Sequence, residues 1–378
     1  MSESQSMDVV EDLVLQLSEP AIKKIDGKRR ALAKSKLIYY PAEKGKPPIE
    51  GKEIVMFEAP IGPIEKEELK WYLERYYIWP AGPFKDRAQK TEKDLPIWGK
   101  AIYDEVFSRD STRDVLSAWA HATGTKRRFT FSIDSRMVEG SKEKKQLEAN
   151  EAASELLSLP WELMHNGKEY MFQGATPIQV RRQLPNTKEL ESIVSEPPIR
   201  ILSVSPRPDD ESAGYIDHRI SAIPLVEAIE NLGGLVELTV LTPATFPALE
   251  EELTNAQQKG TPYHVIHFDG HGTYYEDEGV GALCFEDPAD VDKIEERGVE
   301  LIDARQLAAM VKDYRIPLFF LEACQSAMTE DDPIASVAAA LLNEGAASVV
   351  AMSYTVLVET SRRFVMAFYK ELACGSRI

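Results

Sequence analysis

Two side chains that can act as a nucleophile and a base follow two short apolar runs of the chain. His271 stands in the segment DGHG, directly after residues 265–268, and Cys324 stands in EAC, directly after residues 318–321. Apolar runs of this length are typical of buried parallel strands. Because chemistry collects at the carboxyl ends of such strands, we expect the imidazole and the thiol to meet at one edge of a sheet. A Cys–His nucleophilic pair needs this arrangement.

Neighbouring residues that could compete for these roles have simpler interpretations. His264 and His267 lie in or beside the first apolar run, so we expect them to face the core or the covering helices. Ser326, two residues after Cys324, suits a turn better than a second nucleophile. Asp269 leaves two roles open, since it can orient the loop or the imidazole, or it can cap the turn.

The elements that must position the pair come from an alternation of strands and helices after Pro197-Pro198. We expect strands at residues 199–204, 235–241, 265–268, 318–321 and 347–352, and helices at 217–232, 246–258, 301–313, 333–343 and 356–373. Asp303 is the candidate N-cap of the helix at 301–313. Such alternation predicts right-handed crossovers and a mostly parallel sheet covered on both faces, which is a three-layer α-β-α fold of the α/β class.

The first half of the chain is less regular. We expect strands at residues 54–57, 129–133, 159–164 and 178–182, helices at 65–77, 94–107 and 111–122, and a loop or exposed helix at 135–150. Residues 1–50 have mixed charge with a basic run at 23–36, and they predict a solvated leader, with a helical or partner-dependent arm as the alternative. The domain hypothesis is therefore a leader at 1–50, a first part at 51–196 and a second at 197–378.

An acidic segment, residues 273–300, separates the His271 run from the Cys324 run. We expect a long loop with a hairpin near residues 282–285, into which Cys284 packs. Long loops in such a place are often mobile and functional.

Composition and motifs exclude several classes of protein. The formal charge of −18 argues against a nucleic-acid surface and against an anionic membrane as partners. No apolar run approaches a membrane span, and the first residues do not form a signal peptide, so a cytoplasmic location is expected. Three cysteines, Cys284, Cys324 and Cys374, give neither a disulfide framework nor a zinc pattern. GxxxxGK[ST] and HExxH are absent, which disfavours an NTP-handling switch and a metal hydrolase, and no cofactor or metal is expected.

Five blocks of the sequence, in this order, resemble the CHAT family of caspase-like peptidases, in the clan of caspases and separase. The blocks are residues 159–185, residues 199–208, HVIHFDGHG, LEACQSA and residues 345–372. Residues 71–83 are similar to the leading part of CHAT modules, so the resemblance covers roughly residue 54 onwards. Cys324 follows His271 by 53 residues, close to the caspase spacing of about 50.

The resemblance implies a caspase-like cysteine endopeptidase. Cys324 would be the nucleophile and His271 the general base and later acid, while the N–H groups of Gly272 and Cys324 would form the oxyanion hole. Residues 51–196 would be an inactive pseudo-caspase-like half. CHAT modules usually continue with another helix beyond the point that corresponds to residue 378, so this chain is expected to be truncated there.

The family also implies a role, which remains an expectation. CHAT peptidases resemble regulated executioners that cut a specific cellular protein after a sensor domain or partner signals, often in prokaryotic antiviral defence linked to CRISPR effectors, nucleotide sensing or gasdermin-like proteins. We expect low basal activity that rises when a partner orders residues 273–300. The alternative from another class is a catalytically silent CHAT scaffold that serves as a protein-interaction module.

The residue of the substrate before the cut, P1, is expected to be basic. Glu322 lies two positions before Cys324 and so on the same face of a strand. In caspases the matching Gln lines the P1 pocket, and in metacaspase-like relatives an acidic residue there receives Lys or Arg. Arg207 would favour an acidic P1 or pair with Glu322, whereas Asp209 and Asp210 favour Lys or Arg. Asp269 completes the predicted substrate-binding set.

Overall fold

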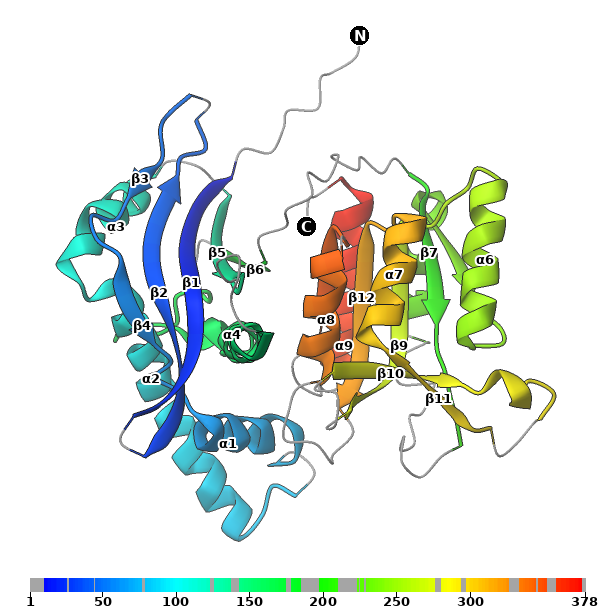
Figure 1. The fold of residues 1–378 in the computed structure, drawn as a ribbon, viewed down its shortest axis with the longest axis horizontal. Coiled ribbons are helices and arrows are strands. Elements are labelled where there is room, and N and C mark those ends of the chain that lie inside the picture. The colour runs from blue at the N-terminus through cyan, green and yellow to red at the C-terminus, as the bar shows by residue number, and fades with distance from the viewer. Residues whose placement is uncertain are drawn as a thin grey trace. The chain divides into compact units, whose positions relative to one another are not determined.

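The protein folds into two compact units, Met1–Pro185 and Asn186–Ile378 (Figure 1). In this computed structural model the residues described are 10–25, 27–43, 45–76, 79–122, 126–136, 143–174, 178–184, 197–209, 223, 225–227, 229–275, 280–293, 297–325, 333–344, 346–351 and 358–375. Asp210, Ser326 and most of the helix expected at residues 217–232 lie outside this set, and residues 223, 225–227, 229 and 230 are helical.

Unit 1 is built on a mixed sheet with β1 (Glu11–Ile25) in its middle. On one side β1 pairs antiparallel with β2 (Lys28–Tyr40), which in turn pairs antiparallel with β3 (Ile49–Glu50) and β4 (Val55–Glu58). On the other side β1 pairs parallel with β5 (Arg127–Asp134), and β5 pairs parallel with β6 (Ile178–Gln183).

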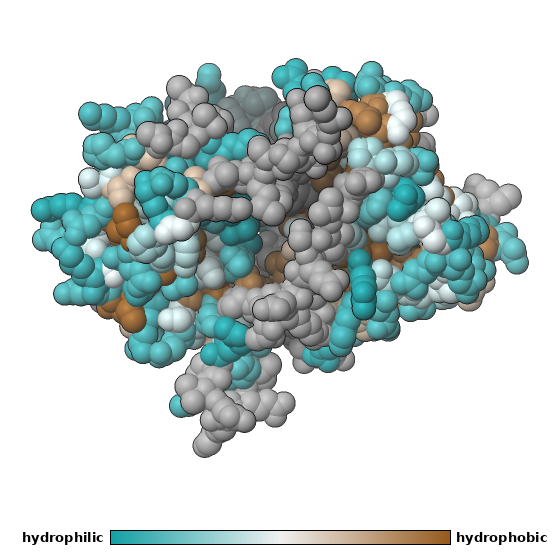
Figure 2. All heavy atoms as spheres, turned by 90° about the horizontal axis from the view of Figure 1, so that it is seen from above, coloured by the Kyte–Doolittle hydropathy of each residue, from teal (hydrophilic) through white to brown (hydrophobic). Residues whose placement is uncertain are grey.

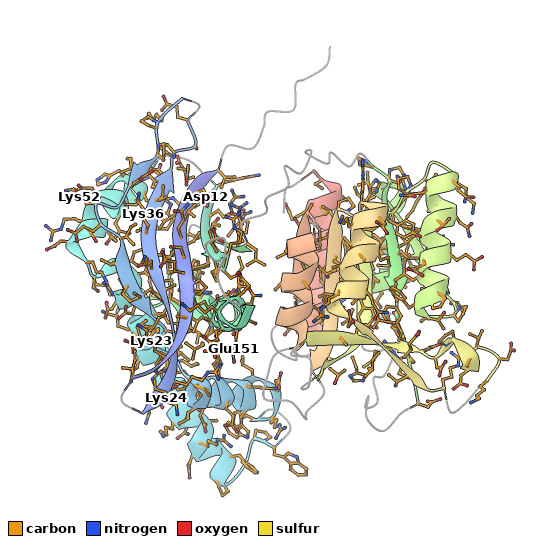
Figure 3. The ribbon with its side chains drawn as sticks, in the orientation of Figure 1. Asp12, Lys23, Lys24, Lys36, Lys52 and Glu151 are labelled. Atoms are coloured by element: carbon orange, nitrogen blue, oxygen red, sulfur yellow. The ribbon has the colours of Figure 1, made fainter. Side chains whose placement is uncertain are left out.

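The prediction of a solvated leader is wrong for residues 11–40, which form the two longest strands of unit 1. Leu13, Leu15 and Leu17 alternate along β1 and are at most 2% exposed. The charged residues of β1 gather towards its two ends, and Figure 3 shows Lys23 and Lys24 near one end of the strand and Asp12 near the other. The basic run therefore belongs to strands, in which apolar and polar residues alternate between the two faces.

Helices α2 (Pro83–Phe107) and α3 (Arg113–Ala120) pack on the leucine face of this sheet, since Phe107 and Trp119 contact Phe129, the register partner of Leu13. The same part of the chain also forms α1 (Pro63–Glu74) and the 3₁₀ turn η2 (Asp110–Thr112). The buried Trp161, in the 3₁₀ turn η3 (Trp161–Leu163), stacks on Phe131 with ring centroids 4.1 Å apart. Residues 161–163 were expected to be part of a strand. The Trp161 indole donates to the carbonyl oxygen of Leu156 at 3.0 Å, which ties the turn to the end of α4 (Glu143–Leu157).

Unit 2 contains the expected parallel sheet. The parallel strands lie in the order β8 (Val236–Val240), β7 (Ile199–Val204), β9 (Val265–Tyr275), β12 (Leu318–Gln325) and β13 (Ser348–Ala351). A short 3₁₀ turn, η4 (Gly233–Leu235), leads into β8.

Two separate apolar cores cover the two faces of this sheet, which confirms the α/β expectation. On one face Ile266, Phe268 and Phe319 pack against α6 (Phe246–Gln258), α7 (Ala304–Tyr314) and α8 (Pro333–Glu344). On the other face Val265 and Phe320 pack against α9 (Val358–Ala373). The Asp303 side chain caps α7 by accepting from the Arg305 and Gln306 amides, as predicted.

The prediction that the strand containing residues 265–268 stops before His271 is wrong. Beyond Gly270, β9 continues to Tyr275 and pairs antiparallel with β10 (Val280–Glu286), which pairs with β11 (Val299–Asp303). The short η5 (Pro288–Asp290) lies between those two strands. Much of the acidic segment is thus an extension of the sheet rather than a loop, while residues 276–279 and 294–296 lie outside the described set.

The described surface is mostly hydrophilic in the view of Figure 2, in keeping with the formal charge of −18. Among the described residues, no helix combines the length and apolar character that crossing a membrane requires.

Candidate active site

His271 and Cys324 occupy the same rung of two adjacent parallel strands. The register of β9 and β12 pairs Glu322 with Asp269, Cys324 with His271, and Gln325 with Gly272, which is the last rung of this ladder. Neighbouring strands lie about 4.8 Å apart, so the two backbones are adjacent at the predicted pair. Both residues lie within strands, yet still at the carboxyl end of the parallel ladder.

The faces of β9 alternate clearly around the pair. Phe268 belongs to the core under α7 and α8, whereas His267 contacts Tyr369 of α9 on the opposite face. His271, 9% exposed, lies four positions after His267 and hence on the α9 face. On β12, Glu322 contacts His267, and position 324 falls on the face of position 322.

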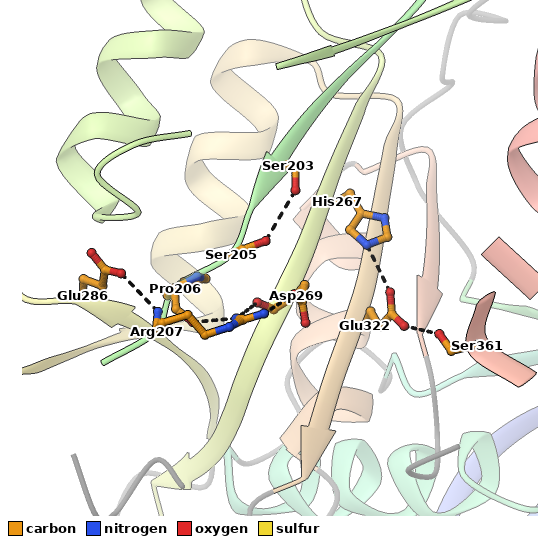
Figure 4. A network of polar contacts seen from close by, with 9 residues as sticks. All are labelled: Ser203, Ser205, Pro206, Arg207, His267, Asp269, Glu286, Glu322 and Ser361. Carbon is orange, nitrogen blue, oxygen red and sulfur yellow. Dashed lines mark hydrogen bonds and ion pairs between the residues drawn. The ribbon is translucent and has the colours of Figure 1, made fainter. Parts of the chain in front are cut away.

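A buried hydrogen-bond chain joins Glu322 to α9 (Figure 4). His267 Nε2 lies 3.2 Å from Glu322 Oε2, and His267 Nδ1 lies 2.8 Å from the Tyr369 hydroxyl. The Ser361 hydroxyl donates to Glu322 Oε1. His267 is 1% exposed and stacks on Phe320, with ring centroids 4.7 Å apart. His267 therefore has a structural environment, as its place within the strand predicts.

Electrostatics keep Glu322 ionised in this chain. Burial alone would raise the pKa of Glu322, but the contact with His267, the Ser361 hydroxyl and the charge of Arg207 together lower the pKa below its ordinary value of 4.5. With Glu322 as a carboxylate, we assign the Nε2–H tautomer to His267, because each contact in the chain then joins a donor to an acceptor.

Arg207 and Asp269 form an ion pair on the same face (Figure 4). The guanidinium binds the Asp269 carboxylate through one terminal nitrogen and donates to the Asp269 carbonyl oxygen at 2.7 Å through the other. The Asp269 side chain is only 5% exposed. The roles expected for Asp269 from the sequence did not include an ion pair with Arg207.

Asp209 lies farther along the same segment and is exposed. Its amide donates to the Arg297 carbonyl oxygen at 2.9 Å, and its carboxylate is 3.5 Å from the Arg297 amide. Arg297 in turn donates to Glu286 Oε2 of β10 at 2.9 Å. The segment that follows β7 is thereby tied to the antiparallel extension of the sheet.

Gly270 and Gly272 flank His271, and their environments differ. A Cβ at Gly270 would lie 2.8 Å from the Phe268 ring and 3.4 Å from Pro206, so a side chain there would displace packed groups. Gly272 is buried and pairs with Leu283 of β10. The predicted contribution of its N–H to an oxyanion hole stays a prediction.

His264 is removed from this constellation, at the other end of β9. Its Nδ1 accepts from the Arg200 amide at 2.9 Å. Burial, and then the charge of Arg200, lower the pKa of His264 to about 4. His264 is therefore neutral near pH 7 and hydrogen-bonded to the backbone, which indicates a structural role.

A comparison with models of protein families shows which family this chain belongs to. The model of the CHAT domain matches residues 149–378, which is more than half of the chain. The protein belongs to the CHAT domain family. The match begins within α4 of unit 1 and runs through the whole of unit 2. A search among curated proteins gives no match.

CHAT domains belong to the caspase-like cysteine peptidases, so the places of the cysteines in this chain are of interest. All three cysteines lie in unit 2, so unit 1 has no thiol from which to build a Cys–His pair. Cys284 is buried in β10, and Cys374 is exposed after α9. For Cys324 the structure describes the backbone. In the described residues, no group of three or more His, Cys, Asp or Glu is arranged to hold a metal ion.

Sequence reasoning missed several residues that shape this CHAT site, namely Glu286, Arg297, Ser361 and Tyr369. His267 was placed correctly, because its position within the strand is a local signal. Tyr369 is 102 residues from His267, and Glu286 is 79 residues from Arg207. Contacts at such separations depend on the topology of the sheet and leave no pattern in a single sequence.

Proposed function

We propose that this chain is a caspase-like cysteine endopeptidase in which Cys324 is the nucleophile and His271 the general base. The observation that carries the proposal is the parallel register that pairs Cys324 with His271 in a CHAT domain. A thiol beside an imidazole is more easily converted to the thiolate, which is the reactive form.

The proposed reaction proceeds in two steps. His271 takes the Cys324 thiol proton, the sulfur attacks the scissile carbonyl carbon to form a C–S bond, and the C–N bond breaks as His271 gives that proton to the leaving amine. Water, deprotonated by His271, then attacks the thioester carbon, and the C–S bond breaks as the proton returns to the sulfur. The N–H groups of Gly272 and Cys324 bind the oxyanion in both steps, and one such donor is typically worth about 3–4 kcal/mol of barrier.

The proposal includes a specific protein substrate and an activating sensor domain or partner, in prokaryotic defence. The motivation is the family, together with the acidic segment that joins the His271 strand to the Cys324 strand. An isolated chain that cleaves at a full rate, with no gain from any partner, would contradict this part.

Cleavage-site mapping in a proteome tests the proposed activity. Wild-type protein should generate new N-termini that are absent with Cys324→Ala or His271→Ala, and the double variant should be about as inactive as either single variant because the pair acts as one unit. Cys374→Ala and His121→Ala are matched controls, since both residues are exposed. Cleavage that persists in Cys324→Ala would refute the mechanism and favour a silent scaffold.

A basic P1 residue is the proposed specificity. The Arg207 charge is balanced by Asp269, while Glu322 keeps its negative charge on the face of position 324. Asp209 adds a further carboxylate at the exposed end of the segment after β7. Each Glu322 oxygen already accepts one internal hydrogen bond, so a Lys or Arg side chain would be recognised through charge and the remaining lone pairs.

A fluorogenic panel with Arg, Lys, Asp, Met or Leu at P1 tests this specificity. We expect Arg and Lys to be preferred, and the preference to weaken in Glu322→Gln. Ser361→Ala is the matched control, because it removes a hydrogen bond to the same carboxylate and keeps the charge. A preference for Asp or Met that Glu322→Gln does not alter would show the specificity to be wrong.

A further inference from the structure

The edge of β9 that faces β7 changes partner immediately before His271. β7 pairs with β9 up to the rung of Val204 and Phe268, and β10 pairs with β9 from the rung of Leu283 and Gly272. On that edge, residues 269–271 lie between the last rung of the β7 register and the first rung of the β10 register. The catalytic candidate thus lies at a transition between a parallel and an antiparallel ladder.

Arg207 lies at this transition. Its side chain donates to the Asp269 carbonyl oxygen, at 2.7 Å, in the way that a neighbouring strand would. The same guanidinium binds the Asp269 carboxylate and the Pro206 carbonyl oxygen. One planar group therefore holds both the backbone and the side chain of Asp269, which a lysine could not do.

The Arg207 contact is anchored from β10 as well. The Arg207 amide donates to Glu286 Oε1 at 3.1 Å, while Glu286 Oε2 accepts from Arg297 at 2.9 Å. The Glu286 side chain is only 6% exposed. Its carboxylate is held by the Arg297 guanidinium on one oxygen and by the Arg207 amide on the other. Glu286 consequently links the segment after β7 to the strand that takes over pairing with β9.

We infer that Arg207 and Asp269 are positioning residues that fix the path of β9 at His271, and that neither selects the P1 residue. The inference rests on the proposed function for its activity readout, but its geometry does not depend on it. Asp269 precedes His271 by two positions, about 6.6 Å along a strand. A shift of the backbone at Asp269 would therefore also shift the His271 imidazole, two residues farther along the strand.

Variants of Arg207 test the inference through kinetics. Arg207→Gln should lower kcat about 100-fold with the order of P1 preference unchanged, because misplacing a catalytic group by about 1 Å costs about that factor. Arg207→Lys should recover part of the loss, since lysine can reach the carboxylate but cannot hold the carbonyl as well. Retained kcat together with a changed P1 order would overturn the inference and place Arg207 in the substrate pocket.

Alkylation of Cys324 by iodoacetamide at pH 6 supplies a readout that needs no substrate. The rate in Arg207→Gln should fall to that of His271→Ala, because a misplaced imidazole no longer promotes the thiolate. A wild-type alkylation rate in Arg207→Gln would overturn the inference. If the wild-type chain cleaves no peptide but shows this fall, the proposed peptidase activity fails and the positioning role stands.

Two further variants separate positioning from folding. Arg207→Met combined with Asp269→Leu removes both charges while keeping side-chain volume, which preserves folding better than breaking one partner. The double variant should remain folded and stay about as inactive as Arg207→Gln, and wild-type activity in it would overturn the inference. Arg182→Gln is the control in unit 1, where Arg182 binds Glu162 and the Leu157 carbonyl oxygen in a similar way.

Discussion

Replacement of Glu322 tests whether the buried chain between β12 and α9 has the hydrogen bonds assigned to it. Glu322 accepts from His267 at 3.2 Å and from Ser361, and its side chain is 12% exposed. Glu322→Leu leaves both donors without their acceptor, and we expect a loss of about 3 kcal/mol in the free energy of unfolding. Ser361→Ala, which deletes one hydrogen bond to a charged group, should cost about 2 kcal/mol.

Glu322→Gln should be much milder, at about 1 kcal/mol. The amide oxygen can accept from Ser361, while the amide NH₂ faces His267. A neutral imidazole can move its proton from Nε2 to Nδ1, so that Nε2 accepts from the amide and Nδ1 donates to Tyr369. The order of stability should therefore be wild type, Gln variant, Leu variant. Loss of the negative charge alone would instead destabilise the Gln and Leu variants equally.

The pH dependence of the difference between wild type and Glu322→Gln supplies a second test. The pKa of Glu322 in the folded chain is below its ordinary value of 4.5, so ionisation of this group stabilises the fold. The stabilisation is complete above about pH 4.5 and is lost as pH falls through the folded pKa.

Hydrogen exchange over α9 and urea unfolding followed by far-UV circular dichroism measure these changes. All five tryptophans lie in unit 1, so tryptophan emission cannot report unit 2. A Gln variant less stable than the Leu variant, or a difference from wild type that grows as pH falls, would refute the assigned hydrogen bonds.

Three other outcomes are expected. Gly99→Ala should destabilise unit 1 by more than about 3 kcal/mol, since a Cβ would lie 1.9 Å from the Leu163 carbonyl oxygen, and an unchanged tryptophan-emission midpoint in urea would contradict it. His264, with its pKa lowered to about 4, should contribute stability that is present above about pH 6.5 and lost on acidification towards pH 4. His264→Gln should reduce this slope in unfolding titrations. Peptidase activity should persist in EDTA because thiol–imidazole chemistry needs no metal, and loss restored by Ca²⁺ or Zn²⁺ would refute this.

Local signals predicted the elements of unit 2 well. The helix at 246–258 and the N-cap Asp303 agree with α6 and α7, because periodicity and capping are encoded within one turn or two. The ends of β9 and β12 were placed too early. Gly270 and Gly272 read as breakers in the sequence, but glycine is compatible with a strand whose neighbours are packed closely, as at Phe268 and Pro206.

Unit 1 was harder to predict for a physical reason. The alternation of Leu13, Leu15 and Leu17 was present in the sequence, but the surrounding charges favoured a solvated segment. The sheet accommodates part of this charge by pairing it, since the buried Asp12 carboxylate accepts from Arg128 and Thr130 of β5. The ion pair of Arg207 with Asp269 and the chain through His267 depend on which strands become neighbours, and they became visible only with the topology.

Successive side chains of β9 face two different cores, and this determines which substitutions keep His271 aligned with Cys324. A slip of β9 by one residue against β12 would move Ile266 and Phe268 out of one core and bring His267 and Asp269 into it. The rung of His271 and Cys324 is therefore specified by apolar residues that take no part in the chemistry. Changes at exposed residues around the site would leave this alignment intact. A polar substitution at Ile266 or Phe268 would weaken it, because both residues are buried in the core that fixes the register.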